Sequence, residues 1–368
     1  MATHPYADLP RRAFWRSAIS ERSALELEGL YEPRFAVDRQ DRIATAGSCF
    51  AQHIGRNFRE RGYGFLDLEP APALLPKAEH LTYGYGMYSA RFGNLYTPRQ
   101  LVQLFERAEG GRAPVEDVWI EADGRHVDPF RPTIEPGGFA DAADYAAARG
   151  AHLAAVRRIP TETDLFVFTF GLTESWRDTR DGSVYPTCPG TVHGEFDPAH
   201  HEFVNFRHRE LLEDFESFMA MMLAANPAVR FLITVSPVPL TATASGGHVL
   251  SATMASKSTL RSVCAELVAS HSQVDYFPSY ELVASHPMRA MFFEPNLRTV
   301  ARRGVAHVMD YFFTAHGEPS AAAPAAPVAA PVAASGAAPA GPAVPAGSGS
   351  AADDDVVCDE AILEAFGR

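Results

Sequence analysis

A serine and a cysteine stand side by side in the stretch TAGSCFAQHIG, residues 45–55, where an apolar run gives way to a helical pattern. Small residues let the backbone turn sharply, and a nucleophile on such a turn is held out toward a substrate. The start of a helix favours the thiolate form of a cysteine, which is the attacking species. Cys49 is therefore the predicted nucleophile and Ser48 the alternative, with capping of the helix as the ordinary role of Ser48.

Metal ligands and other reactive groups give a weaker pattern. The remaining cysteines have neither the C-x-x-C spacing of a zinc knuckle nor that of a disulfide framework: Cys188, Cys264 and Cys358. The stretch HGEFDPAHHEF contains several possible ligands, namely His193, Asp197, His200, His201 and Glu202. Asn205 breaks the H-E-x-x-H pattern, and no phosphate-binding glycine motif occurs. We expect a solvated loop here, no metal site and no cofactor.

The elements that must position the turn alternate between strand and helix. Nearly continuous apolar runs at residues 42–48, 164–171 and 230–237 are typical of strands covered on both faces, and residues 274–280 predict another strand. Helical patterns occupy residues 49–61, 97–108, 210–226, 256–272 and 301–313. This alternation predicts an α/β fold with a central parallel sheet, whose ligand site lies at the carboxyl ends of the strands.

Three further segments flank or interrupt this body, which spans residues 1–317. Residues 112–160 form a predicted insertion, with a hairpin through Asp123-Gly124 and an alanine-rich helix. Residues 318–352 are rich in Ala and Pro and predict a disordered linker. Residues 353–368 form an acidic peptide with apolar residues at helical spacing: Val357, Ile362, Leu363 and Phe366. We expect this peptide to dock on a protein partner, or else to be a solvated tail.

Composition excludes several classes of partner. The chain has 368 residues, 46% of them hydrophobic, and a formal net charge of -13. No basic patch offsets this charge, which argues against nucleic-acid binding. No apolar run approaches the roughly 18 residues of a membrane span. We therefore expect a cytoplasmic protein that binds neither nucleic acid nor membrane.

Several motifs together resemble the GSCFA-domain family over roughly residues 30–314. They are GSCFA at 47–51, RFGNLYTPRQL at 91–101, FGLTESW at 170–176 and VSPVPLTAT at 235–243. That family is related to the SGNH, or GDSL-like, hydrolases. The resemblance implies a three-layer α/β/α sandwich and acyl chemistry on esters.

The resemblance also assigns roles to individual residues. Cys49 stands where those hydrolases have their nucleophilic serine, and Gly93 and Asn94 resemble their oxyanion-binding glycine segment. Thr173 and Glu174 occupy the place of the Asn-Asp pair in a Gly-x-Asn-Asp block, so a hydroxyl or backbone amide must replace the asparagine.

The catalytic base is the point at which the sequence departs from those hydrolases. Asn296 and Thr299 occupy the positions of the Asp-x-x-His pair, and neither can act as a base. His286 and His248 are the candidate bases, since each lies near the expected carboxyl edge of the sheet, while His53 shares a helix face with Cys49. The Ser- and Thr-rich loop before Lys257 is expected to line the site, and Lys257 to offer a cation to an anionic substrate.

These features predict an acyl esterase or O-acyltransferase that acts on a small ester or a carbohydrate O-acyl group. The alternative is a binding or scaffold protein whose catalytic site has decayed, as the missing Asp-x-x-His pair indicates.

Overall fold

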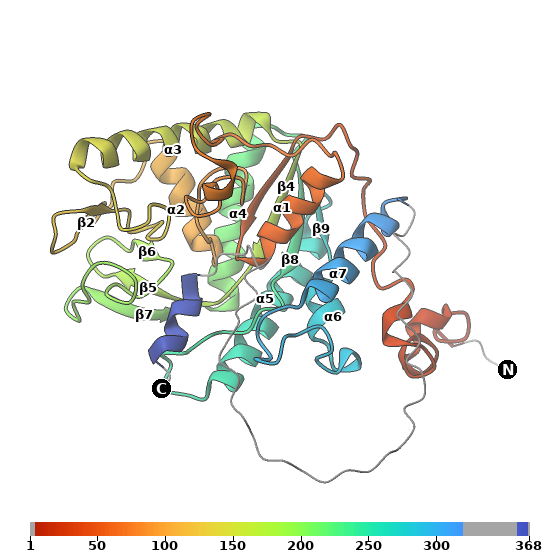
Figure 1. The fold of residues 1–368 in the computed structure, drawn as a ribbon. Helices are drawn as coiled ribbons and strands as arrows, with labels where there is room; N and C mark the ends of the chain where they lie inside the picture. Colours follow the sequence, from red (N-terminus) through yellow and green to blue (C-terminus); the bar gives the residue numbers. More distant parts are fainter. Residues whose placement is uncertain (1–3, 319–358, 367–368) are drawn as a thin grey trace, which may run out of the picture.

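The computed structural model describes residues 4–318 and 359–366 (Figure 1). Within them, four parallel strands form the central sheet in the order β1-β4-β8-β9. Their bounds are β1 Ile43–Gly47, β4 Leu165–Phe170, β8 Arg230–Val235 and β9 Val274–Tyr276. Each corresponds to a strand predicted from an apolar run, so the predicted α/β fold with a central parallel sheet is confirmed.

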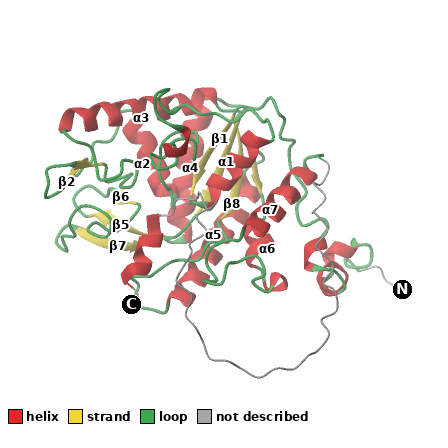
Figure 2. Cartoon of the chain, viewed as in Figure 1, coloured by secondary structure: helices red, strands yellow, loops and turns green. Residues whose placement is uncertain are grey.

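Helices flank both faces of this sheet (Figure 2). Side chains alternate along β4, so Phe166 and Phe168 enter one hydrophobic core while Leu165 and Val167 enter the other. Helices α2 to α5 pack in the first core, and α1, α6 and α7 in the second. Their bounds are α1 Phe50–Glu60, α2 Pro98–Ala108, α3 Ala142–Glu162, α4 His208–Ala225, α5 Val249–Ser270, α6 Ser279–Ala284 and α7 Arg302–Ala315.

After β1, the chain first passes along one edge of this strand and then crosses to its other edge. Residues 64–66 run beside the outer edge of β1, where the Ile43 amide donates to the Gly64 carbonyl at 2.9 Å and the Leu66 amide to the Ile43 carbonyl at 2.9 Å. The next strand, β4, pairs with the opposite edge of β1. In open α/β sheets, a ligand crevice forms where successive connections leave in opposite directions, outside the carboxyl ends of the strands. This rule places the crevice at the ends of β1 and β4.

A smaller antiparallel sheet lies next to this edge. It contains β5 Glu174–Asp178, β6 Val184–Tyr185 and β7 His201–Asn205 in the order β6-β5-β7. The expectation that residues 193–203 form a solvated loop was wrong for His201, which is 4% exposed and begins β7. The predicted hairpin in the insertion is confirmed as β2 Trp119–Ile120 paired with β3 His126–Val127.

The start of α5 differs from the sequence expectation. The helix begins at Val249 rather than near Ser256, because His248 Nδ1 accepts the Leu250 amide at 3.1 Å and caps the helix. Lys257 therefore lies in the third turn, on the buried face of α5. The capping of α2 is as predicted, with Thr97 in a capping box and Pro98 in the first turn.

The C-terminal peptide is described in part. Residues 319–352, which make up nearly all of the predicted linker, and residues 353–358 lie outside the described residues. Asp359–Phe366 forms a 3₁₀ helix, called the C-terminal helix below (dark blue in Figure 1). Of the helices in the two described ranges, none has the length and apolar composition needed to span a membrane.

Gly47 provides a test of the turn geometry. Its φ is +135°, and a Cβ there would lie 2.5 Å from the Thr169 carbonyl oxygen. We expect Gly47→Ala to lower the free energy of unfolding by roughly 2–4 kcal/mol, measured by urea denaturation. The control is Gly150→Ala in α3, where a Cβ meets nothing within 4 Å. It should raise stability by roughly 0.5–1 kcal/mol. Equal effects of both substitutions would contradict the close approach of β1 and β4.

Candidate active site

The Ser48–Cys49 turn lies where the topology places the crevice. Ser48 and Cys49 directly follow β1, and Cys49 is the residue from which α1 starts. Both are nearly buried, with Ser48 2% and Cys49 5% exposed. Cys49 therefore lies at the positive end of α1, a position that favours a thiolate, whereas burial opposes one.

Ser48 does not cap α1 through its side chain. The Ala51 amide instead donates to the Ser48 backbone carbonyl at 2.8 Å. Within the described residues, the buried Ser48 hydroxyl has no hydrogen-bond partner. A buried unpaired hydroxyl costs about 1–3 kcal/mol, so this oxygen remains available to a ligand.

Asn94 lies beside this turn and is held by Tyr88 and Gln52. The Tyr88 hydroxyl contacts Asn94 Oδ1 at 2.6 Å and the Ser48 carbonyl oxygen at 3.2 Å. Gln52 Nε2 donates to the Tyr88 hydroxyl at 3.2 Å. Because Oδ1 is the acceptor in these contacts, the Asn94 NH₂ group is left to donate elsewhere. The preceding Gly93 has a φ of +67°, which allows the chain to turn there.

Helical spacing from Ser48 could have identified Gln52, since four residues separate the two. No local pattern pointed to Tyr88.

The segment after β4 forms the opposite side of the turn. A Cβ at Gly171 would lie 2.9 Å from Ser48 Cβ, so Gly171 leaves the room that the Ser48 side chain occupies. The Thr173 amide donates to Ser256 Oγ at 3.0 Å and is therefore not available as an oxyanion donor. Glu174 accepts from Thr243 Oγ1 at 2.9 Å, and its burial raises the pKa of that carboxyl. The loop before α5 thus contacts Glu174, and its role in lining a substrate site stays a prediction.

Lys257 is buried at the same edge rather than solvated. Its side chain is 1% exposed, and Nζ donates to the Gly171 carbonyl at 2.7 Å. The ammonium therefore lies next to the residue that touches Ser48. A cation in this low-dielectric position favours negative charge on a neighbouring group.

The predicted histidine bases are not bonded to Cys49. His286 stacks on Trp15 with ring centroids 5.2 Å apart, in a separate cavity beside the N-terminal segment. His248 is exposed and caps α5. His53 packs edge-on against Phe50. Burial, with a smaller effect of Arg56, lowers the pKa of His53 to about 4.

The replaced Asp-x-x-His segment forms a closed turn. Asn296 Nδ2 donates to Thr299 Oγ1 at 2.9 Å, and the intervening Leu297 has a φ of +54°. The two side chains that replace the pair therefore bind each other and offer no base to the site.

A cavity of about 880 Å³ runs along α1 from Gln52. Cations predominate in its lining, with Arg56, Arg59, Lys77 and Arg302 facing Glu60 and Asp67. Because Gln52 also contacts Tyr88, the cavity borders the Asn94 network. A chain with a net charge of -13 thus has a locally basic cavity next to its candidate site.

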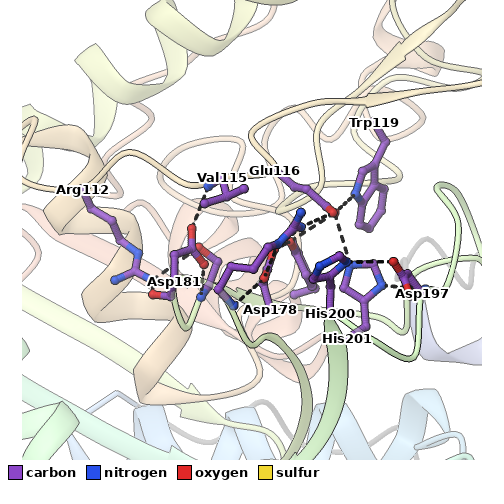
Figure 3. A network of polar contacts seen from close by, with 12 residues as sticks. Arg112, Val115, Glu116, Trp119, Asp178, Asp181, Asp197, His200 and His201 are labelled. Carbon is purple, nitrogen blue, oxygen red and sulfur yellow. Dashed lines mark hydrogen bonds and ion pairs between the residues drawn. The ribbon is translucent and has the colours of Figure 1, made fainter.

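A separate polar cluster lies on the antiparallel sheet, where Glu116, Asp178 and His201 have ligand atoms within 4.8 Å of one another (Figure 3). Arg180 pairs with both carboxylates. His201 Nδ1 accepts the Asp197 amide at 3.1 Å, while Nε2 faces Glu116 at 3.2 Å. Charge and hydrogen bonding are already satisfied within this cluster, so we interpret it as a structural ion-pair network.

The other possible ligands of this stretch are paired on the surface. His193 faces Glu121 at 3.3 Å, His200 faces Asp197 at 2.8 Å, and Glu202 pairs with Arg177.

The protein thus has an α/β fold, and the thiol of Cys49, the amide of Asn94 and the amine of Lys257 lie near the ends of β1 and β4, where the topology places a ligand crevice. The model of the GSCFA family matches residues 42–312, so the chain belongs to the GSCFA family. Comparison with curated proteins and with solved structures gave no match.

The lowered pKa of His53 predicts a pH dependence of stability. The unfolded chain binds a proton at this histidine near pH 6.5, whereas the folded chain does so near pH 4. Stability from this group is complete above pH 6.5 and is lost as the pH falls toward 4. Between pH 6.5 and pH 4, we expect the free energy of unfolding to fall by on the order of 2 kcal/mol less in His53→Gln than in the wild type. Denaturant unfolding curves of both proteins at the two pH values measure this difference. His4→Gln, at an exposed position, should leave the pH dependence unchanged.

Proposed function

We propose that this GSCFA-family protein is an acyl esterase or O-acyltransferase with an SGNH-hydrolase-like three-layer sandwich. Its substrate is a small ester or a carbohydrate O-acyl group, and Cys49 is the nucleophile. The observation that carries the proposal is the Cys49 thiol at the start of α1, on the edge where Asn94 and Lys257 are also buried.

The reaction proceeds through a thioester. The Cys49 thiolate attacks the acyl carbonyl carbon, and the negative charge moves to the carbonyl oxygen. The Asn94 NH₂ group donates to that oxyanion, a contribution typically worth 10²–10³ in rate. Collapse of the intermediate expels the alkoxide, which takes up the proton that the thiol released. Water or an acceptor hydroxyl then attacks the thioester, releases the acyl group and restores the thiol.

The positive groups of this edge take over part of the role of the missing histidine. The α1 dipole and the Lys257 ammonium both favour the Cys49 thiolate, so ionisation needs less help from a general base. As an ammonium, Lys257 can donate a proton to the departing alkoxide and is then neutral, so that it can take up the proton of the next thiol that ionises. Thiols differ from serine hydroxyls in this respect, because a thiol ionises near neutral pH.

The basic cavity supports an anionic substrate. Arg56, Arg59 and Lys77 line it, and it begins at Gln52, one helical turn from the nucleophile turn. A substrate with a carboxylate, phosphate or sulfate group beyond its ester bond fits this charge.

A non-catalytic binding protein is the second candidate function. The observation that favours it is the closed turn in which Asn296 and Thr299 bond each other. In that case the same edge binds an ester or a carbohydrate without cleaving it.

Covalent labelling distinguishes the two functions. We expect an electrophilic acyl probe to label Cys49 in the full chain and a panel of short-chain esters to contain a substrate. Cys49→Ala should abolish both labelling and turnover. Cys188→Ser is the matched control and should change neither, because burial raises the pKa of the Cys188 thiol to about 11.

Turnover that survives in Cys49→Ala would remove Cys49 from the mechanism. Binding of an ester without turnover in the wild-type protein would favour the binding function.

A further inference from the structure

The C-terminal helix places a carboxylate on Asn94. Asp359 is 4% exposed, although it lies at the start of a segment far from the domain in sequence. Asn94 Nδ2 donates to Asp359 Oδ2 at 2.8 Å, and Thr133 Oγ1 donates to Asp359 Oδ1 at 2.6 Å. Both carboxylate oxygens are therefore bound by neutral donors from the domain.

The two donors are held in place by buried groups. Tyr88 and Gln52 fix the amide of Asn94, as described above. The Thr133 loop is held by Arg131, whose Nε donates to Asp128 Oδ2 at 2.9 Å and whose Nη1 donates to the Arg91 carbonyl at 3.1 Å. Both members of this ion pair are buried. The domain thus holds two hydrogen-bond donors, Asn94 Nδ2 and Thr133 Oγ1, in fixed positions.

This carboxylate is connected to the nucleophile turn. Asp359 bonds Asn94, Asn94 bonds Tyr88, and the Tyr88 hydroxyl reaches the Ser48 carbonyl oxygen. The NH₂ group that would receive an oxyanion is the group that Asp359 occupies. An ester substrate that uses this NH₂ group therefore binds at the place where the Asp359 carboxylate lies.

The C-terminal helix makes a second polar contact with the domain. Glu364 lies 3.9 Å from Arg298, in the turn that replaces the Asp-x-x-His pair. The helix therefore extends from the Asn94 side of the site to the 296–299 turn. Phe366 is 68% exposed, so this member of the predicted apolar stripe does not hold the helix on the domain. Val357 lies outside the described residues.

Asp359 is held without full compensation for its burial. Within the described residues no cation pairs with it, and burial raises the pKa of its carboxyl despite the bonds from Thr133 and Asn94. The donors to this carboxylate are neutral: the Thr133 hydroxyl and the side chain and backbone of Asn94.

We propose that Asn94 and Thr133 form a subsite for a small carboxylate, and that the chain fills it with Asp359 and thereby shields the Ser48–Cys49 turn. Beyond its Cα, the Asp359 side chain is an acetate group, and acetate is the product when an acetyl ester is hydrolysed. The subsite therefore fits a short acyl group. This inference rests on the site proposed above, but binding at the subsite does not require that site to be catalytic.

Acetate binding to the full chain tests the subsite. We expect sodium acetate, with sodium chloride as the ionic-strength control, to raise the Tm of Asp359→Gly by about 2–5 °C at saturation. The wild-type chain should respond much less, because its subsite is filled. Asp359→Gly combined with Thr133→Val should lose the response, and neutral acetamide should give none. Equal shifts in wild type and Asp359→Gly, or no shift in either, would overturn the proposal.

Alkylation of Cys49 tests the shielding. We expect Asp359→Ala to increase the rate of Cys49 alkylation by iodoacetamide about 10- to 100-fold, the change expected when charge-assisted hydrogen bonds are lost. The control, Asp8→Ala, removes an exposed carboxylate and should leave the rate unchanged. An unchanged rate in Asp359→Ala would contradict shielding. Neither measurement depends on turnover, so a failed search for an ester substrate would leave both results interpretable.

Discussion

The contact between the ends of β1 and β4 is the constraint on which the site depends. A Cβ at Gly47 would meet backbone atoms of Thr169, and a Cβ at Gly171 would meet Ser48 Cβ and Tyr96, so neither position has room for a side chain. Ser48 lies between them, and its amide donates to the Thr169 carbonyl at 3.1 Å. Because the contact at Gly47 is made with backbone atoms of Thr169, the sheet itself sets the place of the Ser48–Cys49 turn.

Buried polar groups then gather around this fixed turn. Lys257 anchors the β4 side through the Gly171 carbonyl, and Tyr88 anchors the Asn94 side through the Ser48 carbonyl. In both contacts a polar atom of a buried side chain lies within hydrogen-bond distance of a backbone oxygen at the turn or next to it. Such contacts orient the surrounding groups before any ligand arrives, and they act more strongly in a low dielectric than in water.

The sequence predicted the parts of the fold that depend on local patterns. Apolar runs marked the four parallel strands, and Thr97 with Pro98 marked the start of α2. The strands β5 to β7 were missed because they are short and carry charged residues such as Arg177 and Glu202, so no alternation was visible. The edge of the sheet was predictable, since a Gly-Ser-Cys turn after a parallel strand must lie there.

The roles of single side chains at that edge depended on contacts between distant segments. The burial of Lys257 follows from a helix start seven residues earlier than the pattern indicated. His286 was expected near the edge, but the N-terminal Trp15 covers its ring. The pairing of Asp359 with Asn94 joins segments that no local periodicity connects.

The covalent connection between Asp359 and the domain determines how the subsite competes for ligands. A tethered group has an effective concentration that does not change when the protein is diluted, and for tethered groups this is typically on the order of millimolar. To displace Asp359, a free carboxylate must reach a concentration near this effective concentration, multiplied by the ratio of the affinity of Asp359 for Asn94 and Thr133 to its own. If Asn94 and Thr133 form the proposed subsite, its occupancy by a free carboxylate depends on the concentration of that ligand and not on the abundance of the protein.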